Sequence, residues 1–138
     1  SYDASRIYMD DAKKNNPTIE YFIDVHRDSL SKDKTTIEIN NKSYAKTIFL
    51  IGTENPNYQE NLDFVTKINN ILNEKYPNLS KGIYQKGGAG VNGVYNQDNS
   101  RHTMLVEIGG PDNTTDEVLN STLAFCDAFL EVISKNEG

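Results

Sequence analysis

The sequence predicts an α/β fold in which a mostly parallel or mixed sheet is flanked by helices. Two short runs of β-branched and aromatic residues, Ile19–His26 and Thr103–Ile108, are largely apolar, which is typical of buried strands. They alternate with longer segments in which apolar residues recur at helical spacing, such as Tyr58–Tyr76. This alternation is typical of a sheet covered by helices, and 138 residues suit one domain, so we predict a single domain over residues 1–138.

The chain opens with a predicted helix followed by a buried strand. In Ser1–Asn16, Ile7 and Tyr8 fall near helical spacing, and the helix is expected to end before Pro17 because proline disfavours helical geometry in the residue that precedes it. Ile19–His26 follows as the first strand.

The next segments predict a hairpin and a second helix. Thr35–Ile39 and Tyr44–Ile51 are strand-like runs, and Asn40-Asn41-Lys42 between them is a favourable turn. Tyr58–Tyr76 is expected to be helical up to Pro77.

A loop, a strand and a helix are predicted for the remainder of the chain. Lys81–Ser100 contains five glycines and no sustained period, so we expect a long loop, and long loops are often functional. Thr103–Ile108 is an apolar strand. The last helix runs to about Ser134 and begins with Thr114 and Glu117, which have the spacing of a capping box.

Composition excludes several classes of protein. The chain carries 14 Lys and Arg against 20 Asp and Glu, and a net charge of −6 argues against binding to nucleic acid. A single cysteine excludes an internal disulfide framework and a zinc ribbon. No apolar run approaches the roughly 18 residues that cross a bilayer, so we expect no membrane segment here.

Two side chains near the ends of predicted strands are candidates for chemistry. His26 ends the first strand, where a histidine can bind a metal or act as a base; a local capping role is about equally expected. Glu107 lies within an apolar strand, where desolvation tends to raise a carboxyl pKa and suits a general base. The alternative is an edge glutamate that faces solvent. Gly109-Gly110 would let substrate or backbone approach closely. A histidine and a glutamate at two strand ends are consistent with metal-assisted hydrolysis.

Other candidates carry less weight. His102 is an odd number of residues from Glu107, so a strand places them on opposite faces, and a surface or supporting role is expected for His102. Gly88–Gly93 matches GxGxxG but lacks the flanking strand and helix of a nucleotide site, which favours a flexible loop. Cys126 is expected in the core.

A metal-free hydrolase that pairs Glu107 with Glu54 or Asp28 is a distant alternative function and requires two carboxylates about 5 to 9.5 Å apart.

Several short motifs run along the chain in order. They are Asp24–Ser29, Gly52–Asn57 with Glu60-Asn61-Leu62, Tyr95-Asn96-Gln97, and Leu105–Gly109 with Asn113-Thr114 and Glu117. Together they resemble the stage II sporulation protein P family, cell-wall hydrolases related to the zinc-dependent N-acetylmuramoyl-L-alanine amidases. The resemblance spans nearly the whole chain.

The resemblance implies an amidase-like three-layer sandwich and a zinc site built from His, Glu and a second His. His26 matches the second His ligand, and Glu107 matches the catalytic acid/base. Arg27, Asp28 and Asn96 are candidates for binding or orienting the peptide because they lie near these motifs. The expected target is the amide between N-acetylmuramic acid and L-alanine in peptidoglycan, with stem cross-links as a second target.

The resemblance also implies a location and partners. Family proteins carry a membrane anchor, act in the extracytoplasmic cell wall or septal space, and work with the stage II sporulation proteins D and M. The first His ligand and the Glu ligand of the family lie upstream of Ser1. We therefore expect a truncated domain that lacks its N-terminal strand, exposes apolar surface or exchanges strands, binds zinc weakly and is inactive alone. The main alternative is a non-catalytic module that binds the wall or assembles a complex.

Overall fold

The structure is a computed structural model that describes residues 2–137. Its elements run in the following order: α1 (Tyr2–Asn15), β1 (Tyr21–His26), β2 (Thr36–Ile39), β3 (Lys42–Ala45), β4 (Thr47–Gly52), α2 (Tyr58–Lys75), β5 (Ser80–Lys86), β6 (His102–Ile108) and α3 (Thr115–Val132). Short 3-10 turns occur at Lys32–Lys34 and Gln97–Asn99, and a π turn at Ile133–Glu137 follows α3. The predicted first helix is confirmed, except that Ser1 lies outside the described residues.

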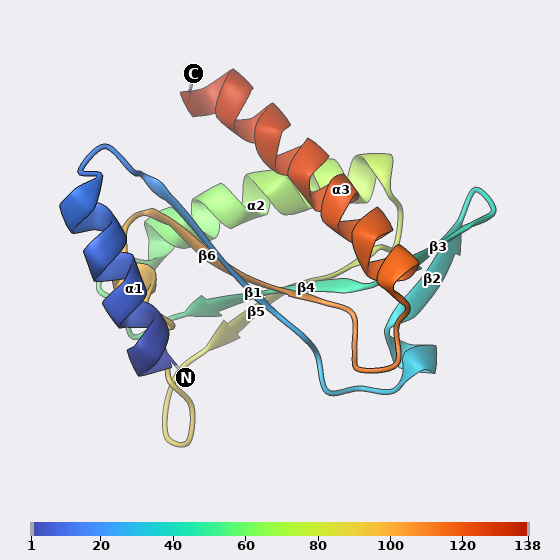
Figure 1. Cartoon of the computed structure of the whole chain (residues 1–138), viewed down its shortest axis with the longest axis horizontal. Coiled ribbons are helices and arrows are strands. Elements are labelled where there is room, and N and C mark those ends of the chain that lie inside the picture. Colours follow the sequence, from blue (N-terminus) through green and yellow to red (C-terminus); the bar gives the residue numbers. More distant parts are fainter. Residues whose placement is uncertain (1, 138) are drawn as a thin grey trace.

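The main sheet is mixed and has the strand order β1-β6-β4-β5. β1 runs parallel to β6 and β4 parallel to β5, whereas β4 and β6 are antiparallel. β2 and β3 form the predicted hairpin as a separate two-stranded sheet. The predicted α/β architecture with a mixed sheet is confirmed (Figure 1).

Helices lie on both faces of the sheet. α2 and α3 pack side by side against one face (Figure 1), where Tyr21 of β1 contacts Phe64 of α2 and Phe129 of α3. Because side chains alternate along a strand, His26 points to the other face, where its ring stacks on Tyr2 of α1. The core lies between the sheet and the α2–α3 layer, and its fully buried large residues include Phe49, Ile51, Ile68, Leu72, Met104 and Val106.

Two predictions about strands were wrong. Tyr44–Ile51 is not one strand, because the chain leaves the hairpin sheet at Lys46 and enters the main sheet as β4. The backbone of Lys46 makes this crossing by donating to Thr35 and accepting from Gly109. The predicted loop over Lys81–Ser100 contains most of β5, an edge strand whose Lys-Gly-Ile-Tyr-Gln-Lys sequence lacks the apolar pattern of a buried strand.

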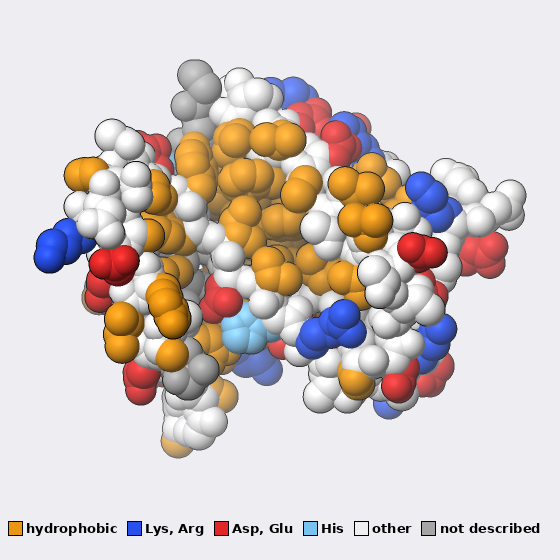
Figure 2. All heavy atoms as spheres, viewed as in Figure 1, with side chains coloured by type: hydrophobic (Ala, Val, Ile, Leu, Met, Phe, Trp, Pro, Cys, Tyr) orange, Lys and Arg blue, Asp and Glu red, His pale blue; other side chains and the backbone are white. Residues whose placement is uncertain are grey.

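Apolar side chains are exposed on the outer side of α3 and at the β1 edge of the sheet. Leu119, Leu123 and Leu130 of α3 are 51%, 60% and 58% exposed, and Val25 of β1 is 60% exposed. Hydrophobic side chains gather over this part of the molecule (Figure 2). Exposed apolar surface is therefore present, whereas the missing N-terminal strand from which it was expected stays a prediction. Cys126 is also exposed, so its predicted place in the core was wrong. It lies on the outer side of α3, with the exposed leucines that form an apolar stripe there. Within residues 2–137, no helix is long and apolar enough to span a membrane.

Candidate functional site

The structure brings the two principal candidates together. His26 and Glu107 are register partners on the adjacent parallel strands β1 and β6, so both side chains lie on the sheet face opposite α2 and α3. Asp24 lies on the same face, two residues before His26. This geometry follows from the parallel pairing, which brings the carboxyl ends of both strands to one edge of the site.

The imidazole of His26 is oriented from two sides. Its Nε2 lies 3.0 Å from Oδ1 of Asp24, and the Tyr2 ring stacks on it with centroids 5.6 Å apart. A pocket of about 470 Å³ opens beside the ring and is lined by Tyr2, Ser5, Asp24, Val25 and His26. A carboxylate that holds one ring nitrogen leaves Nδ1 of His26 as the nitrogen available to bind a metal ion or accept a proton.

Glu107 has a perturbed carboxyl group. Burial raises its pKa, and the nearby charge of Asp28 raises it further, whereas His26, Lys81 and Lys86 act in the opposite direction. A carboxyl whose pKa is raised by burial and a nearby negative charge is a candidate general acid or base. The expected desolvation of Glu107 is therefore confirmed, and three cations or potential cations lie within electrostatic reach of the same group.

The three predicted substrate-binding residues have different surroundings. Nζ of Lys81 lies 3.3 Å from the Asp28 carboxylate, whose charge acts on Glu107. Arg27 donates from Nη1 to the Gly110 carbonyl at 3.0 Å. Asn96 donates from its amide to the Tyr2 carbonyl and to Oγ of Ser5. A substrate role for Arg27, Asp28 and Asn96 stays a prediction.

The groups that lie close to the two glycines after Glu107 belong to the chain itself. The Gly109 carbonyl accepts from the backbone of Asp28 at 2.7 Å, and the Gly109 backbone donates to Lys46 at 2.8 Å. Gly109 has a φ of +65°, and a Cβ there would lie 2.6 Å from Asn113 Oδ1. Gly109 is thus the junction between the ends of β1 and β6 and the start of β4.

His102 lies on the opposite face, as predicted, but not at the surface. It is 3% exposed, and its ring stacks on Tyr21 at 4.6 Å and meets Phe64 edge-on at 4.7 Å. The expected surface position was wrong, because the α2–α3 layer covers this side of β6, whereas a supporting role for His102 stays a prediction. In the sequence, His26 and His102 are the same residue type beside the same kind of strand. They differ in position, since His26 ends β1 and His102 begins β6, and in the covering of the sheet, since α2 and α3 cover only the face that carries His102.

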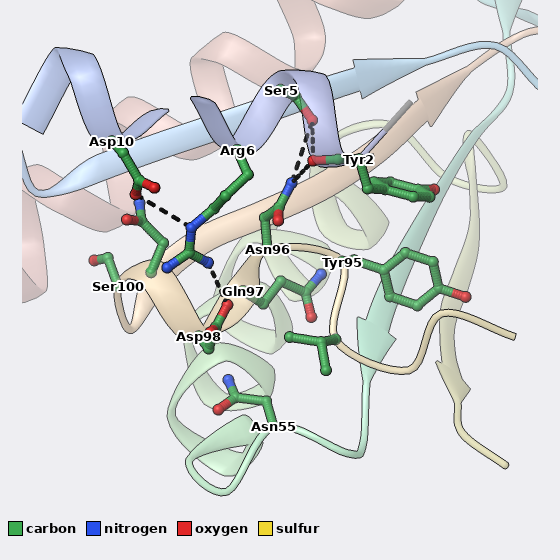
Figure 3. Close-up of polar contacts among 12 residues, drawn as sticks. Tyr2, Ser5, Arg6, Asp10, Asn55, Tyr95, Asn96, Gln97, Asp98 and Ser100 are labelled. Carbon is green, nitrogen blue, oxygen red and sulfur yellow. Dashed lines mark hydrogen bonds and ion pairs between the residues drawn. The ribbon is translucent and has the colours of Figure 1, made fainter. Parts of the chain in front are cut away.

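Sequence reasoning missed an aromatic wall beside the site. Tyr95 meets the Tyr2 ring edge-on with centroids 5.3 Å apart, although the two residues lie far apart in the chain. Arg6 pairs with Asp98 at 2.7 Å, and this contact, with the two Asn96 bonds, holds the start of α1 against the 95–98 segment (Figure 3). No local sequence pattern identifies such a long-range contact.

The described residues do not make a complete zinc site. A catalytic zinc ion requires three protein ligands and a water molecule. Across residues 2–137, no group of three His, Cys, Asp or Glu side chains is arranged to hold a metal ion. The His26–Asp24 pair matches the common arrangement in which a carboxylate orients a metal-binding histidine, and a ligand role for His26 stays a prediction.

Fold and site together define a mixed α/β domain that presents a histidine and a pKa-shifted glutamate on adjacent strand ends. The chain belongs to the stage II sporulation protein P family, because residues 1–130 match the family model described as Stage II sporulation protein P (SpoIIP). It is similar to Stage II sporulation protein P of Bacillus subtilis (strain 168), with 42% identity over 132 residues. That match covers 96% of this chain and 33% of the relative, so the chain spans about a third of the relative's length. No solved structure gives a significant match.

Proposed function

We propose that this chain is part of a zinc-dependent peptidoglycan hydrolase that cleaves the amide between N-acetylmuramic acid and L-alanine, with stem cross-links as a second target. The observation that carries the proposal is the placement of Glu107, with its raised pKa, beside His26 on one sheet face. Membership of the sporulation family supports it.

The proposed reaction assigns roles to the described side chains. Glu107 takes a proton from the attacking water, oxygen adds to the amide carbon, and the proton passes to the amine as the C–N bond breaks. His26 would hold zinc through Nδ1, with Asp24 orienting the imidazole at Nε2. In this proposal, the longer protein supplies the other family ligands, a His and a Glu. In this proposal, Arg27 and Lys86 bind carboxylates of the peptide, and Asp28 and Asn96 orient it. Nζ of Lys86 lies 5.7 Å from the Tyr84 ring centroid.

A second candidate is a non-catalytic module that binds the wall or assembles a complex. The exposed apolar stripe on α3 and the exposed Val25 on β1 favour it, because such surface often marks contact with a partner. The stage II sporulation proteins D and M are the proposed partners. For either candidate we propose an extracytoplasmic location in the cell wall or septal space, in a protein with a membrane anchor.

Full-length protein with Glu107→Gln, His26→Ala or Glu74→Gln distinguishes the two candidates. Purified sacculi are digested with and without chelator, and bound zinc is measured. The hydrolase predicts stoichiometric zinc in the unmodified protein, loss of zinc in His26→Ala, and at least a ~100-fold loss of rate in Glu107→Gln with zinc retained. Glu74 is exposed on α2, so Glu74→Gln is the matched control and keeps full activity. Zinc-free, inactive full-length protein would instead favour the module.

A further inference from the structure

The segment that carries Tyr95 is held in an uncommon backbone conformation. Tyr95 and Asn96 have φ values of +54° and +59°, and consecutive non-glycine residues in this region are unusual because each costs about 1 kcal/mol or more. Asn92 supports the turn, since its Oδ1 accepts from the backbone of Tyr95 at 2.6 Å. Strain of this kind persists only where the surroundings enforce it.

Buried amide side chains supply that enforcement. Gln97 is 1% exposed; it accepts from the Gly52 backbone at 2.8 Å and donates to the Leu50 carbonyl at 2.7 Å. Asn61 of α2 donates to the carbonyl of Gln97 at 3.2 Å and to that of Thr103 at 2.9 Å. These bonds fix the segment to the end of β4 and to the start of β6. The Tyr95 side chain is therefore held rigidly before any ligand binds.

The Tyr95 hydroxyl is not used within the described chain. Most of the residue is buried (7% exposed), and among residues 2–137 no hydrogen bond to its Oη is formed, so the hydroxyl at the accessible end of the ring is open to a ligand. The hydroxyls of Tyr95 and Tyr2 point to the same side, away from Arg6 and Asp98 (Figure 3). Glu107 lies within electrostatic reach, since its charge, after burial, raises the pKa of Tyr95.

We propose that the Tyr95 hydroxyl donates a hydrogen bond to the carbonyl oxygen of the amide that is attacked beside Glu107, and so stabilises the negative charge that develops there. The inference rests on the proposed hydrolase function and adds to it a residue that touches the reacting group. A neutral donor in a fixed position is what such a role requires. No bond to Tyr95 forms or breaks, and its proton stays on the phenol.

Full-length, metal-replete protein with Tyr95→Phe tests the proposal on a defined muropeptide containing the N-acetylmuramoyl-L-alanine bond. We expect kcat to fall about 100-fold, with KM within a factor of two, because removal of one such donor acts on the transition state. The thermal midpoint should stay unchanged, because the hydroxyl has no partner in the described chain. Tyr8→Phe is the matched control, since Tyr8 is 76% exposed on α1, and it keeps the unmodified rate.

The outcomes separate this inference from the function on which it rests. A Tyr95→Phe protein with kcat within threefold of the unmodified protein overturns the inference while Glu107→Gln still reports on the hydrolase. A raised KM at constant kcat also overturns it, because that result indicates ordinary substrate binding. If Tyr95→Phe folds poorly, 3-fluorotyrosine at position 95 keeps the packing and should move the alkaline limb of the kcat profile to lower pH. An unmoved limb contradicts the role. An unmodified protein that hydrolyses nothing refutes both proposals.

Discussion

Glu117 is the acidic residue whose removal should destabilise the fold most clearly. Its Oε2 accepts from Oγ of Ser43 at 2.6 Å, and its Oε1 accepts from the backbone of Thr114 at 2.9 Å and from the Asn113 amide at 3.2 Å. The Thr114 side chain accepts in return from the Glu117 backbone, which completes the predicted capping box of α3. The hydrogen bond from Ser43 is the main reason that the Glu117 pKa falls from 4.5 to about 2.

The size and the sign of the effect follow from this shift. A pKa lowered from 4.5 to about 2 corresponds to about 3 kcal/mol of stability contributed by the ionised carboxylate. Because the pKa is lower in the folded state, the contribution is complete well above pH 4.5 and disappears as pH falls toward 2. At pH 3 less than half of it remains, or about 1.4 kcal/mol. Loss of a helix cap and of a charge-assisted hydrogen bond gives a similar total of about 2 to 4 kcal/mol.

Glu117→Gln removes the charge and keeps the shape. Urea unfolding of this variant and of the unmodified chain, from pH 7 to pH 3, should give a difference of about 2 to 3 kcal/mol at pH 7 that at least halves by pH 3. Glu74→Gln is again the control. A difference below about 0.5 kcal/mol at pH 7 would refute the reasoning. So would a difference that is the same at both pH values, because the amide of the variant should match the carboxyl of Glu117 only when that carboxyl is protonated.

Two further outcomes are expected from the structure. Gly109→Ala should lower the free energy of unfolding in urea by about 2 to 4 kcal/mol. The φ of Gly109 is +65°, and the new Cβ would lie 2.6 Å from Asn113 Oδ1 and 2.8 Å from Ala45 Cβ. An unchanged free energy of unfolding would contradict this geometry. Chelator should leave the thermal midpoint of the 138-residue chain unchanged, because no three-ligand group exists among residues 2–137, and a fall of several degrees would reveal a structural metal.

Periodic elements were predictable from the sequence, whereas edges and crossings were not. α2 and β6 follow from apolar spacing because both face the core. β5 was missed because an edge strand is stabilised by backbone pairing with β4 and needs little apolar pattern. The break at Lys46 depends on bonds to Thr35 and Gly109, which lie far from each other in the chain.

For the candidate site, the residues on strands were predictable from the sequence, whereas the contacts between distant segments were not. The sequence predicted His26 and Glu107 individually, each near the end of a strand, and the parallel register of β1 and β6 makes them neighbours. Tyr2 and Tyr95 were missed because their contact depends on the buried Gln97 and Asn61 amides, and such amides resemble surface residues in a sequence. The different fates of His26 and His102 likewise depend on which sheet face the helices cover.

The motif that runs from Glu107 to Glu117 combines two kinds of residue. Glu107 faces the candidate site, whereas Asn113 accepts from the Gly110 backbone at 2.8 Å and donates to Glu117, so the α3 cap is bonded to the turn that follows β6.

That turn also binds the end of β1, since Gly109 accepts from Asp28 and Gly110 accepts from Arg27. His26 and Glu107 therefore keep their register partly because the cap holds the turn. A charge lost at Glu117 should thus affect more than stability. In the proposed hydrolase, Glu117→Gln should lower kcat at temperatures where the protein remains folded, because Glu107 is less firmly placed. Unchanged kcat in that range would confine the cap to a purely stabilising role.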